Sequence, residues 1–177
     1  EMCIRDRPTD AWYAKAVNTL SSLGMLGGYP DGTFRPDAPI TRAEFAAIAL
    51  AFAYDPASAS CSYTDVNTSA WYYTYVAQAT TYGWIGGYPD GTYRPTKKVT
   101  TGEALKMILL AAGYPEPESA ASHWARGYLN FAIEQGFLTR YEDISDLDVN
   151  MTRGMLAKLA ANALGLSDPG TYGTFTD

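Results

Sequence analysis

Residues 27–36 read GGYPDGTFRP, and almost the same ten residues return 59 positions later as GGYPDGTYRP, at residues 86–95. The two copies differ only where Phe34 is replaced by Tyr93. A repeat this close indicates that the chain is built by duplication of one unit. It also favours a multivalent binding or anchoring module over an enzyme, because a single active site rarely needs the same loop twice.

The residues on either side of the loop predict a helix before it and a helix after it. The preceding stretch, AWYAKAVNTLSSLG, spaces apolar residues as one helical face and ends at Gly24, a usual helix terminator. The following stretch begins with Thr41 and has Glu44 three residues later, which is the pattern of a capping box. In such a box the Thr41 hydroxyl accepts from the Glu44 amide, and the Glu44 carboxylate accepts from the Thr41 amide. The face of the first helix is predicted to comprise Trp12, Ala16, Val17, Leu20 and Leu23.

The same pattern divides the chain into three units. Unit one is placed at residues 8–54 and unit two at residues 63–113, where Trp71 and Thr100 lie 59 residues after Trp12 and Thr41. Unit three, at residues 120–166, is degenerate. Its loop reads TRYEDISDLDVN, without the Gly-Gly pair, and Met155 stands where Thr152 would need Glu for a capping box. Residues 1–7 are expected to be a non-native leader, and residues 167–177 a linker to a following domain.

One helical hairpin of this size cannot bury both its apolar faces, whereas three hairpins can bury them against each other. The sequence therefore predicts an all-α fold of three helix-loop-helix units that share a central helical bundle.

Composition excludes several classes of function. The net charge of -6 argues against nucleic-acid binding, which needs a basic face. No run of 18 apolar residues predicts a membrane span. Two cysteines and the single His123 offer neither a disulfide framework nor a metal spacing, and no nucleophile–base pair or paired-carboxylate motif is visible. We therefore expect no enzyme activity, no cofactor and no metal.

The first helix W-x-x-x-A-V, the loop GYPDGTFRPDAPITRAEF and the apolar second helix resemble the S-layer homology domain family. The resemblance covers residues 10 to about 166 as three units. It implies a pseudo-threefold arrangement whose inter-unit grooves bind secondary cell-wall polysaccharide, which often carries pyruvate ketals. It further implies non-covalent anchoring of a bacterial surface protein to peptidoglycan, an extracellular location at the cell wall or surface layer, and a secretion signal outside this stretch. Association with other surface-layer proteins is a further expected partnership.

The resemblance also indicates the residues of the grooves, where the arginine of TRAE and the glycine-rich loop are typical contributors. Arginine offers a planar carboxylate two parallel hydrogen bonds, glycine lets the backbone approach a sugar, and aromatic rings pack on sugar C–H faces. The candidate ligand-binding residues are Arg42, Gly28, Tyr29, Trp12, Trp71, Gly87, Tyr88, Trp124 and Arg153.

The three units are not equally complete. Arg42 matches the TRAE arginine, Thr101 occupies that position in unit two, and Arg153 keeps the arginine of unit three beside a lost loop. This pattern predicts one strong groove around Arg42 and at most one weaker groove, with hybrid sites between neighbouring units left open.

Structural roles are the alternative for several of these residues. Asp31 and Asp90 are expected to form turns, and Arg35 and Arg94 to pair with neighbouring aspartates. The three tryptophans Trp12, Trp71 and Trp124 fit a core position as well as a groove wall. A surface-layer scaffold without glycan binding is the alternative function.

Overall fold

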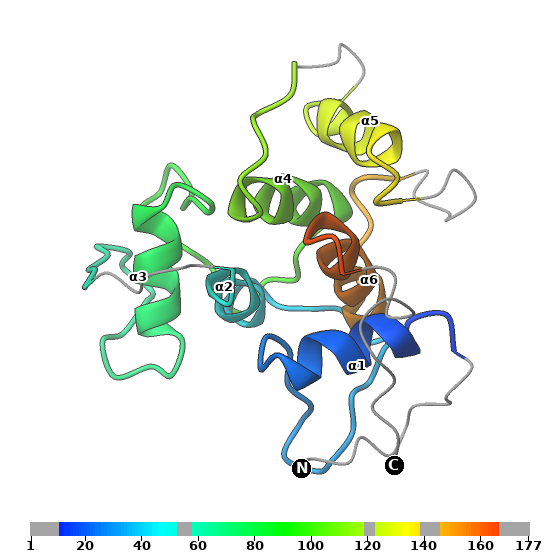
Figure 1. The fold of residues 1–177 in the computed structure, drawn as a ribbon. Coiled ribbons are helices and arrows are strands. Elements are labelled where there is room, and N and C mark those ends of the chain that lie inside the picture. Colours follow the sequence, from blue (N-terminus) through cyan, green and yellow to red (C-terminus); the bar gives the residue numbers. More distant parts are fainter. Residues whose placement is uncertain (1–10, 53–57, 119–122, 139–145, 167–177) are drawn as a thin grey trace.

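The computed structural model describes residues 11–52, 58–118, 123–138 and 146–166, and these residues form six helices and no strand (Figure 1). The predicted all-α class is therefore confirmed. The expected leader at residues 1–7 and the expected linker at residues 167–177 lie outside the described residues. The helices are α1 Ala14–Ser22, α2 Arg42–Leu50, α3 Tyr73–Thr81, α4 Thr101–Ala111, α5 Arg126–Glu134 and α6 Arg153–Ala163. None of them combines the length and the apolar character that crossing a membrane requires.

The second helix of each unit starts at the predicted threonine. The Glu44 amide donates to Thr41 Oγ1 at 3.2 Å, and the Thr41 amide donates to Glu44 Oε2 at 2.8 Å. The capping box of unit two at Thr100 is formed in the same way. Thr152 accepts from the Met155 amide at 3.3 Å without a returning bond, because methionine offers no acceptor of comparable strength. All three caps were predicted.

The first helix of unit one differs in part from its prediction. Gly24 follows α1 with φ of 71°, so the predicted end is confirmed, and Val17 and Leu20 are buried as expected. Trp12 and Leu23 are instead more than half exposed. Trp12 precedes the first helical turn and Leu23 is the C-cap, so neither follows the direction of the buried face.

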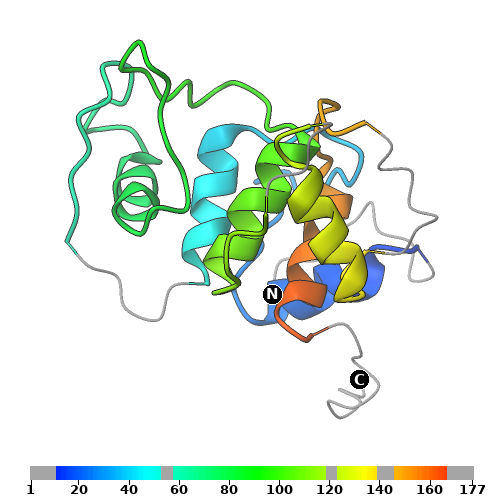
Figure 2. The same ribbon diagram turned by 90° about the horizontal axis from the view of Figure 1, so that it is seen from above.

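The helices form an inner and an outer set. Helices α2, α4 and α6 lie next to one another in the middle of the molecule, and α1, α3 and α5 lie around them (Figures 1 and 2). Each outer helix packs on the inner helix of the preceding unit: α3 on α2, α5 on α4, and α1 on α6. The contact between α1 and α6 joins the first unit to the third, so the helix pairing runs round a closed ring. A pseudo-threefold relation between the units remains a prediction.

A ring of backbone hydrogen bonds joins the residues that precede the three cap threonines. The Ile40 amide donates to the Met151 carbonyl at 3.1 Å, the Met151 amide to the Val99 carbonyl at 2.9 Å, and the Val99 amide to the Ile40 carbonyl at 3.0 Å. All three residues are fully buried. Each unit thus contributes one donor and one acceptor, which holds the N-terminal ends of α2, α4 and α6 together. These bonds hold the loop that precedes each of the three residues in place relative to the neighbouring units.

Candidate functional site between the units

Each repeated loop is closed by its own side chains. Asp31 accepts from the Thr33 amide at 3.0 Å and the Thr33 hydroxyl at 2.7 Å, and it also pairs with Arg35. The hydroxyl and amide of Thr33, followed by Arg35, hold the pKa of Asp31 down to about 2. Unit two repeats this network around Asp90. The turn-forming role predicted for the aspartates and the pairing predicted for the arginines are therefore confirmed.

The arginine that follows the first cap threonine reaches into the next unit. Arg42 Nε donates to the Tyr93 carbonyl at 2.8 Å, and Arg42 Nη2 donates to the Gly86 carbonyl at 2.6 Å. The guanidinium carbon lies 4.5 Å from the centre of the Tyr93 ring and 5.2 Å from that of Tyr88. Only 5% of Arg42 is exposed, and its Nη1 lies 3.5 Å from Glu103 Oε1. Arg42 of unit one is thus built into the loop of unit two. We call this contact the Arg42 junction.

Arg153 makes the same contact between units three and one. Its Nε donates to the Phe34 carbonyl at 2.9 Å, and its Nη2 donates to the Gly27 carbonyl at 2.7 Å. Its guanidinium carbon lies 4.7 Å from the centres of both the Tyr29 and Phe34 rings. This second contact, the Arg153 junction, therefore combines the arginine of the degenerate unit with the intact loop of unit one.

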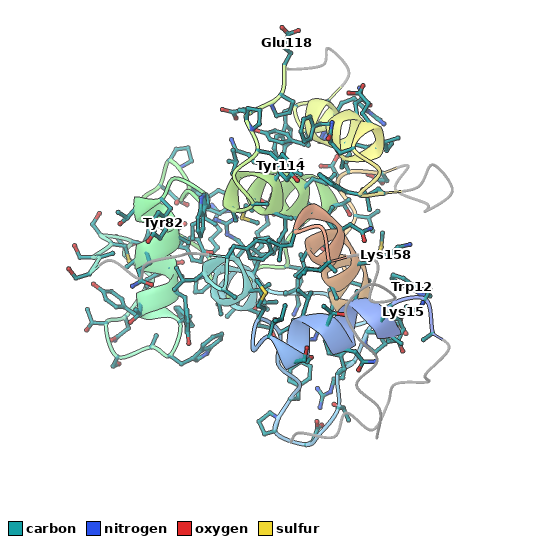
Figure 3. The ribbon with its side chains drawn as sticks, viewed as in Figure 1. Trp12, Lys15, Tyr82, Tyr114, Glu118 and Lys158 are labelled. Carbon is teal, nitrogen blue, oxygen red and sulfur yellow. The ribbon has the colours of Figure 1, made fainter. Side chains whose placement is uncertain are left out.

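The third junction, between units two and three, has lost both parts. Thr101 stands in place of the arginine, and its hydroxyl donates to the Val149 carbonyl at 3.0 Å. The opposite loop belongs to unit three, where the glycine-rich sequence is absent. On α6, the Lys158 Nζ lies 5.8 Å from the centre of the Trp12 ring of unit one (Figure 3).

The two sequence defects therefore fall at one place, and two junctions stay complete. Sequence reasoning paired each arginine with the loop of its own unit and expected a single intact combination. In the structure, Arg42 and Arg153 instead contact the loop of the following unit, which is the hybrid pairing that was left open. The sequence signal for this pairing is the distribution of the two losses: unit two lacks the arginine, and unit three lacks the loop.

A cavity of about 380 Å³ opens at the Arg42 junction. All three units line it, since Arg42 comes from unit one, Trp124 from unit three and the remaining wall from unit two. Gly87, Tyr88, Glu103 and Lys106 are part of that wall. Four predicted ligand-binding residues thus meet in one cavity: Arg42, Gly87, Tyr88 and Trp124.

The other predicted residues lie elsewhere. Gly28, Tyr29 and Arg153 belong to the Arg153 junction, and the repeat gives Trp71 the same position there as Trp124 has in the cavity. Trp12 lies against α6 near Gly154, the residue after Arg153, and does not line this cavity. Gly87 also has a packing role, because a side chain there would collide with the Tyr63 ring.

The cavity wall holds charges of both signs. Lys97 Nζ donates to the Tyr88 hydroxyl at 2.8 Å and lies 3.4 Å from Glu103 Oε1. The hydrogen bond with Tyr88 raises the pKa of Lys97, so the ammonium stays charged at neutral pH. Lys106 Nζ lies 3.1 Å from Glu116 Oε1. Cations, an exposed indole and a tyrosine ring around one hollow are suited to a sugar that carries an acidic group. Within the part of the chain that the structure describes, no three metal-binding side chains gather.

Comparison with known families identifies the repeated units. The family model of the S-layer homology domain matches residues 4–46 and 62–105. The chain belongs to the S-layer homology domain family. The two S-layer homology matches cover most of units one and two, including Arg42 and both glycine-rich loops. Unit three lies outside both matches, and its assignment as a third S-layer homology unit remains a prediction.

Several curated relatives of this S-layer homology chain carry the names of cell-wall, surface-layer or anchoring proteins. It is 35% identical over 160 residues to the middle cell wall protein of Brevibacillus brevis, covering 88% of this chain and 15% of the relative. It is 33% identical over 172 residues to a surface layer protein of Brevibacillus choshinensis, covering 93% and 15%. It is 36% identical over 110 residues to a cellulosome-anchoring protein of Acetivibrio thermocellus, covering 59% and 24%. The chain thus spans less than a quarter of the length of each of these relatives.

Proposed function

We propose that this chain is a non-catalytic module that anchors a bacterial surface protein to the cell wall. It does so by binding an anionic secondary cell-wall polysaccharide at the Arg42 and Arg153 junctions. S-layer homology membership and the cell-wall and surface-layer relatives give it an extracellular location at the cell surface. The name of the cellulosome-anchoring relative supports an anchoring role.

The observation that carries the proposal is the cavity at the Arg42 junction. The whole chain has a net charge of -6, so an anionic polymer has to be bound by locally placed cations. The cavity supplies them in Arg42 and Lys106, next to the exposed ring of Trp124. Because these groups come from three units, the cavity exists only in the assembled ring.

The test uses purified cell-wall sacculi, before and after hydrofluoric acid removes the secondary polymer. We expect the chain to sediment with native sacculi and to stay in solution with stripped ones. Trp124→Ala should weaken binding about fivefold, because an aromatic face in contact with a sugar is worth about 1 kcal/mol. Trp12→Ala is the matched control, since Trp12 is similarly exposed but does not line this cavity.

Two results would contradict the proposal. Equal binding to native and stripped sacculi would favour the alternative, a scaffold that associates with other surface-layer proteins. Equal losses in the two tryptophan variants would remove the cavity from the binding site.

A further inference from the structure

The two complete junctions differ in charge although their loops are nearly identical. At the Arg42 junction, Lys97 and Lys106 occupy positions that unit one fills with Ala38 and Ala47, 59 residues earlier. Lys106 lines the cavity, and Lys97 contacts Tyr88 on its wall. Duplication therefore produced two similar frames, only one of which carries additional cations.

Both lysines can reach a bound anion. Their side chains are 41% and 39% exposed; Lys106 pairs with the exposed Glu116, and Lys97 lies 3.4 Å from Glu103, whose side chain is 20% exposed. Exposed ion pairs of this kind contribute little, so an acidic ligand in the cavity competes for the ammonium groups at small cost. At this junction Arg42 and the two lysines face the carboxylates of Glu103 and Glu116. The net charge of these five side chains is +1.

The Arg153 junction is electrically balanced. Arg153 is matched there by Glu44, whose Oε1 accepts from the Tyr29 hydroxyl at 3.2 Å. Burial raises the pKa of Glu44, but hydrogen bonds from Thr41 and Tyr29 and the charge of Arg153 outweigh it, so the net shift is downward. Glu44 is therefore ionised at neutral pH and cancels the charge of Arg153.

By the correspondence of the repeats, aromatic rings take the place of the charges at the Arg153 junction. Trp71 is 60% and Tyr75 37% exposed, and their ring centroids are 6.3 Å apart. The repeat gives them the positions of Trp124 and Tyr128 at the Arg42 junction. There Tyr128 is buried and donates to Glu116, the partner of Lys106. Where alanine replaces that lysine, the tyrosine ring is left open to solvent.

We propose that the two junctions bind chemically different sugars: the Arg42 junction takes a sugar with an acidic substituent, and the Arg153 junction takes an uncharged sugar. Lys106 and Lys97 are the specificity-determining residues. The inference rests on the proposed function, because it assumes that both junctions bind glycan.

Tryptophan side chains let each junction be observed separately. Trp84 and Trp124 line the cavity of the Arg42 junction, the repeat assigns Trp71 to the Arg153 junction, and Trp12 lies outside the cavity, against α6 near Gly154. The four indole N–H signals are followed by nuclear magnetic resonance during titration with methyl mannopyranoside 4,6-pyruvate ketal. A second titration uses the methyl ester of the same ketal, which has the same ring but no charge.

We expect the free acid to shift the Trp84 and Trp124 signals at about fivefold lower concentration than the Trp71 signal, and the ester to remove that difference. Lys106→Ala, which installs the residue found in unit one, should abolish most of the preference for the acid. The reciprocal Ala47→Lys should lower the concentration at which the acid shifts Trp71. Ala47 is partly exposed, so the longer side chain has room.

The outcomes separate the two claims. Equal titration midpoints for the acid and the ester at the Trp84 signal would overturn the inference while leaving glycan binding in place. A preference for the acid that Lys106→Ala does not change would do the same. If neither probe shifts an indole signal at millimolar concentration while sacculi still bind, the junctions do not recognise this class of sugar and the inference falls. If sacculi do not bind either, the proposed function falls with it.

Discussion

The Thr101 hydroxyl donates to the Val149 carbonyl at 3.0 Å, and the other two units have an arginine at the position of Thr101. The Thr101 amide donates to the same carbonyl at 2.8 Å, and the Gly102 amide donates to the Leu147 carbonyl at 2.9 Å. At the Arg42 junction, the amides of Arg42 and Ala43 donate in the same manner to the carbonyls of Lys97 and Pro95, which lie in the segment before α4. The third junction has thus kept its backbone frame and lost its long cation. The backbone frame of a junction therefore forms without the arginine.

Where the arginine is present, it is a structural residue as well as a candidate ligand-binding residue, as Arg42 shows. Its guanidinium is buried and satisfies two backbone carbonyls. Arg42→Ala leaves both carbonyls without their donor, and we expect the free energy of unfolding to fall by about 2–4 kcal/mol. Urea denaturation measures this directly. Arg35→Ala, which removes an exposed ion pair, is the control and should cost less than about 1 kcal/mol. An Arg42→Ala chain of unchanged stability would show that its hydrogen bonds do not support the fold.

The ring of helix contacts leads to a second expectation. Val17 and Leu20 lie on the buried face of α1, and α1 packs on α6, a helix of the third unit. A fragment that ends at residue 118 lacks both α5 and α6, so it exposes the buried faces of α1 and α4. We expect such a fragment to bind a hydrophobic dye and to unfold over a broad range, whereas the full chain unfolds in one sharp transition. A sharp transition in the fragment would mean that two units form a complete core.

The sequence predicted local structure well because its signals are local. Thr41 and Thr100 with their glutamates define helix starts, and Gly24 defines a helix end, all within a few residues. The partner of Arg42 could not be read in this way, since Tyr93 lies 51 residues away in the next unit. Only the closed ring of α1 on α6 determines that Arg153 meets the loop of unit one.

Acid should weaken the fold through the loop aspartates. Hydrogen bonds from Thr92, with Arg94, lower the pKa of Asp90 to about 2 in the folded chain. A carboxylate with a depressed pKa adds stability that is present above the pKa of the unfolded chain, near 4, and is lost as pH falls toward 2. Thermal melts between pH 2 and 5 should therefore show a falling midpoint, and the fall should be smaller in Asp90→Asn, which cannot titrate. An identical pH dependence in the variant would remove Asp90 from the acid response.

Thr101→Arg tests whether an arginine alone makes a binding site. The unit-three loop lacks the glycine pair and the Asp-Gly-Thr turn, so no copy of the loop faces this position. Thr101 is 4% exposed, and its replacement has to place a long cation where a hydroxyl now binds Val149. We expect a loss of about 2–4 kcal/mol in the free energy of unfolding and no additional ligand site. Thr101→Ser, which keeps the hydroxyl, should stay within about 1 kcal/mol of the parent chain.

Binding stoichiometry with the charged glycoside, measured by calorimetry, should not exceed two per chain in any of the three proteins. A third site in Thr101→Arg would show that the arginine, rather than its combination with the glycine-rich loop, is sufficient for recognition.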